Sequence, residues 1–443
     1  MAIFKLKGTH LKHHKNTSEC VPVRMETPKK VIIPMSMHIG APARPVVAVG
    51  DSVKVGQLVG EAGAGLSSPV YSGVSGTVKK IDDMITVSGT HVTTVVIETD
   101  GEQTVSETVV PPVVTNREEF LAAVKDSGLV GLGGAGFPTV VKLSADPSTI
   151  DTLVINGAEC EPYITSDTRT MIDSPDEVAE GIGLIQKYLG IKNAVIGIEN
   201  NKPKCIAAMR RATAEMEGVS VKALPALYPQ GGEKVLVYHT LGRVIGEGQL
   251  PHHVGVIVIN CTTVAAIAKY LNTGMPLVEK CVTVDGSAIA EPKNVIAPIG
   301  TPVLDLIEFC GGFKCPPRKI LAGGPMMGSA LPDLNVPVLK QTNAILAFDR
   351  KDATPPEASA CIKCGRCAEH CPLKLTPDSI AKAYNAKDPA GLEKAKVNLC
   401  MECGCCSYVC PAKRNIVQTN KLAKAMLRNH QMNQAKEKGG EKK

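Results

Sequence analysis

Two copies of one cysteine spacing near the C-terminus constrain this chain of 443 residues more than any other feature. Each copy runs C-x2-C-x2-C-x3-C and is followed directly by proline; the first ends at Cys371 and the second at Cys410. Four thiolates at these separations can wrap a cubane of iron and sulfide, and in paired runs the fourth cysteine of each run binds the other cluster. We therefore predict two [4Fe-4S] clusters that exchange single electrons.

This interleaving divides the cysteines into two ligand sets. The first three cysteines of the first run join the last cysteine of the second run, which gives Cys361, Cys364, Cys367 and Cys410. The second set is Cys400, Cys403, Cys406 and Cys371. Cys405 lies beside Cys406 and is not expected to be a ligand.

Other uses of so many cysteines fit the pattern less well. Disulfide frameworks are typical of small secreted chains, and residues 1–15 are basic but lack the apolar stretch of a secretory signal. Zinc could bind paired C-x2-C motifs, but it explains neither the third cysteine of each run nor the x3 spacing and the proline. Oxygen-labile clusters and further free thiols indicate a reducing cytosol.

The composition excludes several classes of partner. A formal charge of +6 is modest, since each oxidised cluster with its thiolates would contribute about −2. Aromatic residues make up only 3% of the chain and tryptophan is absent, which disfavours a base-stacking platform, so we expect no nucleic acid partner. The sequence has no apolar run of about 18 residues that could cross a bilayer, so we expect any membrane association to be peripheral and to depend on a partner.

Changes of pattern along the chain predict a multidomain protein of mixed α/β and β structure. We expect an irregular N-terminal segment (1–45), a barrel-sandwich module (46–100), a Rossmann-like α/β domain (115–272), a β-grasp module (275–335), an α-helical two-cluster domain (356–430) and a disordered tail (431–443). Within the α/β domain, strands are predicted at 152–155, 194–198, 219–224 and 254–259, and helices at 117–126, 176–189, 202–217, 232–240 and 263–272. This alternation favours a parallel sheet covered by helices.

The barrel-sandwich module resembles biotinyl and lipoyl domains. The segments 49–56 and 69–78 resemble the two halves of such a domain. A carrier domain needs a lysine at the tip of its hairpin, and the nearest lysines here are Lys54 and Lys79. We therefore expect a structural role rather than a carrier role.

A glycine-rich loop opens the α/β domain. Residues 128–142 read G-L-V-G-L-G-G-A-G-F-P-T-V-V-K. Glycines free the backbone for unusual φ values, and backbone amides in such a loop can cradle an anion, so the loop is a candidate phosphate site. No clear strand leads into it, so it is not the G-x-G-x-x-G arrangement. The alternative is a glycine-rich turn packed beneath a sheet.

An acidic segment follows the first predicted strand of the α/β domain. Residues 156–162 read N-G-A-E-C-E-P, which brings an amide and two carboxylates to the carboxyl end of a strand. Ligands of open α/β sheets bind at that edge, and carboxylates can accept hydrogen bonds from ribose hydroxyls. The alternative is a solvated acidic turn.

Together these motifs carry a family resemblance. The glycine loop, residues 156–162 and the later G-G-E-K at 231–234 resemble the flavin- and NADH-binding subunit of respiratory complex I. With the barrel-like N-terminus, the H-I-G-A-P loop at 38–42 and the double cysteine run, residues 30–425 resemble the C subunit of the Rnf complexes in domain order. Rnf complexes are membrane ferredoxin:NAD oxidoreductases that pump Na⁺ or H⁺. The β-grasp module at 275–335 resembles the SLBB type.

The resemblance implies a non-covalent FMN and NAD(H) as substrate. FMN would lie against Gly131, Gly133, Gly134, Gly136, Lys142 and Asn156, with Gly232 and Glu233 beside the flavin and Asn260, Thr262 and Thr263 at its phosphate. Phe137 would stack on the nicotinamide nucleotide, and Glu159 and Glu161 would form hydrogen bonds with it. No protein acid or base is expected at the reacting carbon, because hydride passes directly between the cofactors.

The resemblance also implies partners and a place in the cell. The chain would be a peripheral subunit on the cytoplasmic face of the membrane, would bind integral membrane and iron–sulfur subunits of the same complex, and would exchange electrons with ferredoxin indirectly. Two alternatives remain at this point. One is a soluble flavin and iron–sulfur NADH-dependent reductase similar to cobalamin reductases, and the other is a passive electron adaptor without flavin or nucleotide.

Overall fold

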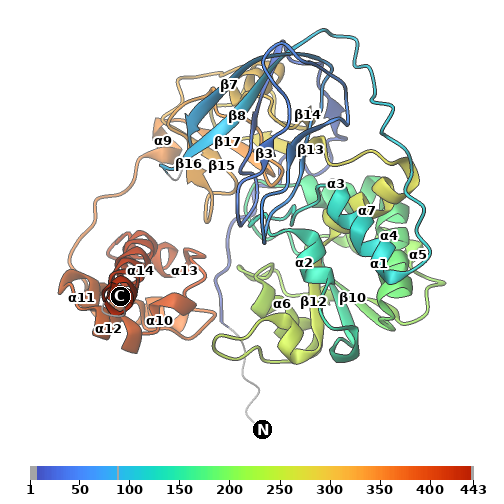
Figure 1. The fold of residues 1–443 in the computed structure, drawn as a ribbon. Coiled ribbons are helices and arrows are strands. Elements are labelled where there is room, and N and C mark those ends of the chain that lie inside the picture. Colours follow the sequence, from blue (N-terminus) through green and yellow to red (C-terminus); the bar gives the residue numbers. More distant parts are fainter. Residues whose placement is uncertain (1–6, 87–88, 441–443) are drawn as a thin grey trace.

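The computed structural model describes residues 7–86 and 89–440, and it places four modules around a shared centre (Figure 1). The barrel-sandwich and β-grasp modules lie together at the top of the view. The α/β domain lies below them, and the helical cluster module stands to one side. An extended stretch that follows α9 (Arg350–Ala353) leads to the cluster module.

The barrel-sandwich module consists of two antiparallel sheets. The first has the order β2 (Lys30–Pro34), β8 (His91–Thr99), β7 (Gly76–Ile85) and β4 (Ser52–Val53); the second has the order β3 (Arg44–Pro45), β5 (Leu58–Glu61) and β6 (Val70–Tyr71). Alternating apolar residues such as Val31, Ile33, Val95 and Ile97 fill the space between the sheets. Because β2 and β3 belong to it, the module begins before residue 46, and the prediction that residues 1–45 are irregular is wrong for these segments.

The α/β domain has the parallel sheet that the sequence predicts. Its strands are β9 (Thr152–Asn156), β10 (Asn193–Glu199), β11 (Val219–Leu224) and β12 (Val256–Asn260), in the order β11-β10-β9-β12. The helices are α1 (Arg117–Asp126), α2 (Thr139–Leu143), α3 (Ser166–Asp173), α4 (Pro175–Leu189), α5 (Pro203–Ala212), α6 (Glu233–Leu241) and α7 (Cys261–Thr273), with short 3-10 turns at Pro147–Thr149 and Pro251–Val254. Helix α5 ends earlier than predicted, and α2 and α3 were not predicted.

The order of these strands reverses between β9 and β12. The chain runs outward from β9 through β10 to β11, then returns to add β12 on the other side of β9. In open α/β sheets the crevice at such a reversal is where ligands bind. Asn156 and Asn260 end the two strands and are paired in register, so both stand at this crevice.

The β-grasp module contains a six-stranded mixed sheet and one helix. The strand order is β1 (Val23–Arg24), β14 (Lys293–Pro298), β13 (Glu279–Asp285), β17 (Ala344–Phe348), β15 (Lys319–Ala322) and β16 (Ser329–Ala330), and helix α8 (Val303–Phe309) packs on it. The sheet therefore takes strands from outside the predicted range of 275–335. The N-terminal segment supplies β1, and a strand after residue 335 supplies β17.

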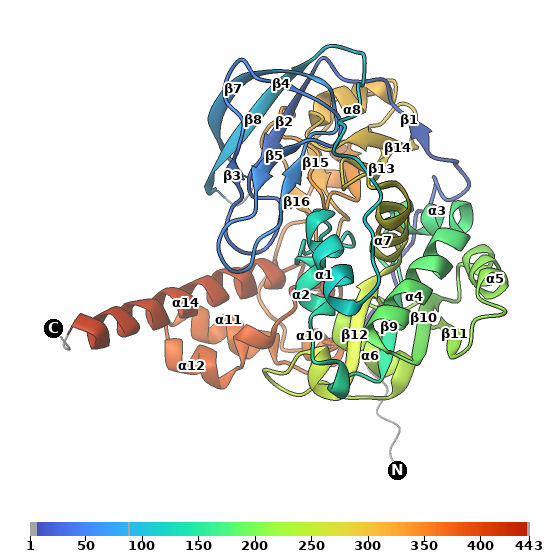
Figure 2. The same ribbon diagram turned by 45° about the vertical axis from the view of Figure 1, so that its right-hand side comes forward.

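The cluster module is helical, and the backbone repeats itself around the two cysteine runs. Its helices are α10 (Arg366–Glu369), α11 (Pro377–Asn385), α12 (Pro389–Lys394), α13 (Cys405–Tyr408) and α14 (Ile416–Gly440), with a 3-10 turn at Val397–Leu399. Gly365 and Gly404, at equivalent positions of the runs, both have positive φ and precede α10 and α13. Helix α14 projects away from the other modules (Figure 2) and continues to Gly440, so the prediction of a disordered tail from 431 is wrong up to that residue. Residues 441–443 lie outside the described part of the chain.

Candidate functional site

The glycine loop and the ends of β9 and β12 enclose an open pocket of about 630 Å³, here called the glycine-loop pocket. Its lining includes ten of the fourteen residues predicted to contact a cofactor: Gly131, Gly133, Gly134, Gly136, Phe137, Lys142, Asn156, Glu233, Asn260 and Thr263. These residues come from four separate stretches of sequence. The fold therefore brings together most of the predicted site.

The loop closes on itself and on α7. The amide of Gly131 donates to the carbonyl oxygen of Phe137 (2.8 Å), and the amide of Leu132 donates to the Thr263 hydroxyl (3.1 Å). A Cβ atom at position 133 would lie 2.9 Å from Nδ2 of Asn260, so only glycine fits there without displacing the asparagine. The close approach brings the loop backbone to the start of α7.

The start of α7 borders the pocket through Asn260 and Thr263. Asn260 is the N-cap, and its Oδ1 accepts from the amide of Thr263 (3.2 Å). The Asp167 carboxylate holds this end in place, since Nδ2 of Asn260 and Oγ1 of Thr262 each donate to it at 2.7 Å. A helix N-terminus with free amides favours an anion such as a phosphate. Thr262 itself does not line the pocket, because its hydroxyl is directed at Asp167.

A lysine–glutamate pair joins two walls of the pocket. Nζ of Lys142 lies 2.8 Å from Oε1 of Glu233 and 3.2 Å from the carbonyl oxygen of Val258. Both side chains are about one-third exposed, so the pair can exchange partners when a charged ligand enters. Asn156 connects β9 to the loop before α6, because its Nδ2 donates to the carbonyl oxygen of Gly231 (3.0 Å).

The pocket also presents an unsatisfied polar atom. Oγ1 of Thr139 is buried and has no hydrogen-bond partner, and Thr139 lines the pocket. Buried polar atoms almost always have a partner, so this hydroxyl requires one from a bound molecule or water. Together with the glycine cradle and the amide end of α7, this fits a phosphorylated ligand such as FMN.

Three other predicted contact residues lie elsewhere. The Glu159 carboxylate is buried and accepts hydrogen bonds from the amide of Asp167 (2.7 Å) and the hydroxyl of Thr168 (2.7 Å), which caps α3. Burial raises the pKa of Glu159. Its oxygens are occupied inside the protein, so the structure does not support a direct nucleotide contact by Glu159. Gly232 precedes α6 but is not part of the lining; a Cβ there would meet Met401 of the cluster module at 2.5 Å.

The Glu161 carboxylate binds the β-grasp module instead of lining the pocket. It accepts from the amides of Met326 (3.1 Å) and Met327 (2.8 Å), and the Tyr228 hydroxyl lies 3.5 Å away. Burial raises the pKa of Glu161 to about 7, although the two amides favour the ionised form. Its predicted role as a nucleotide contact is likewise not supported by its position.

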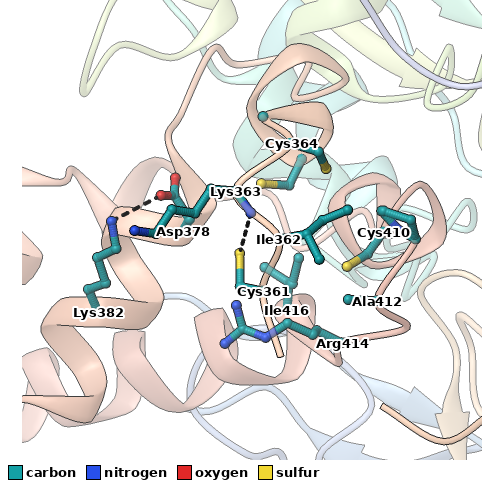
Figure 3. A pocket seen from close by; sticks show the side chains of 13 residues that line it. Cys361, Ile362, Lys363, Cys364, Asp378, Lys382, Cys410, Ala412, Arg414 and Ile416 are labelled. Atoms are coloured by element: carbon teal, nitrogen blue, oxygen red, sulfur yellow. Dashed lines mark hydrogen bonds and ion pairs between the residues drawn. The ribbon is translucent and has the colours of Figure 1, made fainter. Parts of the chain in front are cut away.

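The eight cluster cysteines gather into two openings with the interleaved composition that the spacing predicts. The outer cage, as we call it, is lined by Cys361, Cys364, Cys367 and Cys410 (Figure 3). The inner cage is lined by Cys371, Cys400, Cys403 and Cys406 and has a volume of about 360 Å³. Each opening thus takes its fourth thiol from the other run, which fits a [4Fe-4S] cluster in each.

Each cage is an open space lined by four thiols. Within residues 7–86 and 89–440, no three histidine, cysteine or acidic side chains lie close enough to hold one metal ion. Backbone and side-chain N–H groups also point at the thiols, as in the contacts of the Leu375 amide with Cys371 (3.4 Å) and of Asn420 with Cys400 (3.5 Å).

The two cages differ in their surroundings. The inner cage faces the α/β domain: the Tyr228 hydroxyl donates to the carbonyl oxygen of Cys403 (2.8 Å), and Leu11, Cys160, Tyr228, Cys403 and Cys405 form one buried cluster. The outer cage faces solvent, with Cys361 and Cys364 exposed and Ile362 67% exposed. The molecule therefore has an inner and an outer electron site relative to the glycine-loop pocket.

The sequence did not single out Tyr228, Asp167 or Thr139. Tyr228 and Asp167 have hydrogen-bond partners far away in the chain, and the Thr139 hydroxyl lacks a partner. A single sequence shows neither property. Thr139 lies within the glycine-loop segment, and this was the only signal that could have indicated it. Within the described residues, no helix is long and apolar enough to cross a membrane.

Models of four protein families match successive parts of the chain. They are the RnfC barrel sandwich hybrid domain (residues 4–102), the Nuo51 FMN-binding domain (124–269), the SLBB domain (281–330) and the 4Fe-4S dicluster domain (357–416). The matches confirm the predicted set of modules. They also place the glycine-loop pocket in the flavin domain and both cages in the dicluster domain.

Curated relatives resemble nearly the whole chain. The C subunit of the proton-translocating ferredoxin:NAD(+) oxidoreductase complex of Clostridium ljungdahlii is 42% identical over 383 residues, which is 84% of this chain and 83% of the relative. The C subunit of the Na(+)-translocating complex of Acetobacterium woodii is 40% identical (85% and 86%). The C subunit of the ion-translocating oxidoreductase complex of Rhodobacter capsulatus is 40% identical (96% and 83%).

A solved structure shares the fold. The NAD+-reducing [NiFe]-hydrogenase in its H2-reduced state matches with a TM-score of 0.52 at 22% identity, over 70% of this chain and 63% of the hydrogenase chain. At this identity the likeness concerns the fold alone.

Proposed function

Because this chain belongs to the family of C subunits of ion-translocating ferredoxin:NAD oxidoreductase (Rnf) complexes, we propose that it carries electrons between NAD(H) and the iron–sulfur subunits of such a complex. Its cofactors are FMN and two [4Fe-4S] clusters. The integral membrane subunits couple this transfer to the movement of Na⁺ or H⁺, and ferredoxin exchanges electrons with the chain indirectly. We place the protein peripherally on the cytoplasmic face of the membrane.

The observation that carries the proposal is the order of the sites. The glycine-loop pocket lies in the α/β domain, the inner cage is attached to that domain through Tyr228 and Cys403, and the outer cage opens to solvent. When bound, FMN would take an electron pair from NADH as hydride and pass single electrons on, and the clusters would accept them one at a time.

The residues of the pocket have separable tasks. The amides of the glycine loop and of the start of α7 would hold the FMN phosphate, with Asn260 and Thr263 fixing the helix end. Lys142 and Glu233 would close the wall beside the flavin, and Phe137 would offer a ring for the nicotinamide nucleotide. Since hydride transfer needs no protein acid or base, the task of the pocket is to align the two rings.

The surroundings of the outer cage indicate the kind of surface that docks there. Lys363, Lys382 and Arg414 line its opening, against one carboxylate from Asp378, and Ile362 offers an exposed apolar contact (Figure 3). A partner with an acidic rim around its own redox centre would complement this face. We propose that the iron–sulfur subunit of the complex docks at this face.

The two alternatives are supported less well. A passive adaptor would need neither the glycine cradle nor the unsatisfied Thr139 hydroxyl. A soluble reductase similar to cobalamin reductases does not match the relatives, which are subunits of ion-translocating complexes.

Anaerobic mixing of the reconstituted chain with NADH tests the proposal. We expect NADH to bleach the cluster absorbance in the FMN-loaded chain, and to leave it unchanged in the same preparation stripped of FMN. If the FMN-loaded chain with intact clusters is not reduced by NADH, the proposal is wrong. A chain that cannot be loaded with FMN would support the adaptor.

A further inference from the structure

We propose that Lys340 is a positioning residue that holds the glycine loop in its ligand-binding shape, with the barrel-sandwich and β-grasp modules as the two sides of a clamp. The inference rests on the proposed function, since the ligand of the loop is FMN. It also gives a task to two modules that contribute no residue to the lining of the pocket.

Lys340 joins three modules with one ammonium group. It follows the β-grasp helix in the chain, before β17, and its side chain is fully buried. Its Nζ donates to the carbonyl oxygens of Pro69 (2.6 Å) and Gly128 (2.7 Å) and to the hydroxyl of Ser68 (3.1 Å). Pro69 and Ser68 belong to the barrel-sandwich module, and Gly128 is the first residue of the glycine-loop segment.

Further bonds from the same two modules fix the residues just before the loop. The Ser68 hydroxyl also donates to the carbonyl oxygen of Gly128 (3.1 Å). The Tyr71 hydroxyl donates to the carbonyl oxygen of Asp126, and the amide of Leu277 donates to that of Ser127 (2.9 Å). Three consecutive residues at the base of the loop are therefore held by partners outside the α/β domain.

The far end of the loop is held as well. The amide of Ile39, in the H-I-G-A-P loop of the barrel-sandwich module, donates to the carbonyl oxygen of Gly136 (3.0 Å). Gly136 has a φ of +66°, and a Cβ atom there would stand 3.5 Å from Gln341, the residue that follows Lys340. The loop is thus held at both ends, while Cβ atoms at the pocket-lining Gly131, Gly133 and Gly134 would meet no atom of the clamp.

The lysine is suited to positioning because a fully buried ammonium is costly unless its hydrogens are bound. Burial lowers the pKa of Lys340 to about 7, and three oxygen acceptors favour the charged form. The neighbouring titratable group, His38, is itself buried and lies in the Ile39 loop. Among the described residues no carboxylate forms an ion pair with Lys340. Its hydrogen bonds go to the backbone of the glycine-loop segment at Gly128 and to Ser68 and Pro69 of the barrel-sandwich module.

The test compares FMN binding to the cluster-loaded chain with and without the lysine. K340M keeps the volume of the side chain and removes all three donors. We expect the FMN dissociation constant, measured by quenching of flavin fluorescence, to rise about 10- to 100-fold, because the base of the loop is released. The midpoint potential of the bound flavin should become more negative, since a buried positive charge is lost.

A second variant keeps the proposal testable if K340M does not fold. S68A removes one of the two donors to Gly128 but keeps the charge, so FMN binding should weaken severalfold with an unchanged potential. S72A is the matched control, because Ser72 is a buried serine of the same module. Among the described residues its hydroxyl bonds only to Val74, donating to the carbonyl oxygen (2.7 Å) and accepting from the amide (3.3 Å). Its FMN affinity should equal that of the wild type.

The outcomes separate this inference from the proposed function. Wild-type affinity in a folded K340M, or in S68A where K340M does not fold, would overturn the positioning role while leaving FMN as the ligand. A wild-type chain that cannot bind FMN would instead refute the proposed function. Intact cluster EPR signals in each variant would show that the cluster module is unaffected by the change.

Discussion

Tyr228→Phe tests whether one hydrogen bond holds the cluster module on the flavin domain. The change removes only the hydroxyl, which is 2.8 Å from the carbonyl oxygen of Cys403 in a largely buried contact. A buried carbonyl left without its donor costs about 1–3 kcal/mol. Because about 1.4 kcal/mol corresponds to a factor of ten, the population with this contact open should rise about 5- to 150-fold.

Amide hydrogen exchange measures the population in which the contact between Tyr228 and Cys403 is open. We expect amides near residues 228–232 and 400–405 to exchange faster by that factor in the anaerobic, cluster-loaded protein, with iron content unchanged. Tyr408→Phe is the control, because Tyr408 is 51% exposed and the same chemical change there should have no effect. Equal exchange in wild type and Tyr228→Phe would refute the view that this bond fixes the inner cage against the flavin domain.

Three further predictions concern the pocket, the acidic segment and the outer face. Gly133→Ala places a Cβ 2.9 Å from Nδ2 of Asn260 and should weaken FMN binding, measured by titration, about 5- to 150-fold. The control Gly183→Ala places its Cβ 3.6 Å from the nearest neighbour and should leave FMN affinity unchanged. Equal affinities in the two variants would contradict FMN binding at the glycine loop. Burial raises the pKa of Glu161 to about 7 from 4.5, so the folded state binds the proton more tightly than the unfolded state, and the stability of the protein should fall as pH rises from about 4.5 to 7. Glu161→Gln should show a smaller fall in Tm across that range, and parallel curves of Tm against pH would exclude the shift. Lys363→Glu should slow electron transfer to an anionic acceptor and reduce its salt dependence, and an unchanged dependence would argue against electrostatic docking.

The cluster ligands could be predicted from the sequence because their spacing is local. Each run holds three thiols within seven residues, and the exchange of the fourth thiol follows from the pairing of runs, which the two cages reproduce. The glycine loop was also visible, since Gly133 marks a place where a side chain would collide and Gly136 has a positive φ that favours glycine. The parallel sheet followed from alternating strands and helices, as predicted.

What sequence reasoning missed depends on long-range contacts. Glu161 looked like a free acid at a strand end, yet its partners Met326 and Met327 are more than 160 residues away. Lys340 bonds Gly128 across 212 residues, and Tyr228 bonds Cys403 across 175. No local pattern distinguishes such a residue from any other lysine or tyrosine. The early strands β2 and β3 were missed because their partners in the sheets come later in the chain.

The order of the electron sites is the central claim, and EPR of variants lacking one cage tests it most directly. In Cys361→Ala/Cys364→Ala the outer centre is lost, and NADH should still reduce the inner centre. In Cys400→Ala/Cys403→Ala the outer centre, first verified by chemical reduction, should stay oxidised when NADH is added. Rapid reduction of the outer centre by NADH in the absence of the inner one would contradict the account.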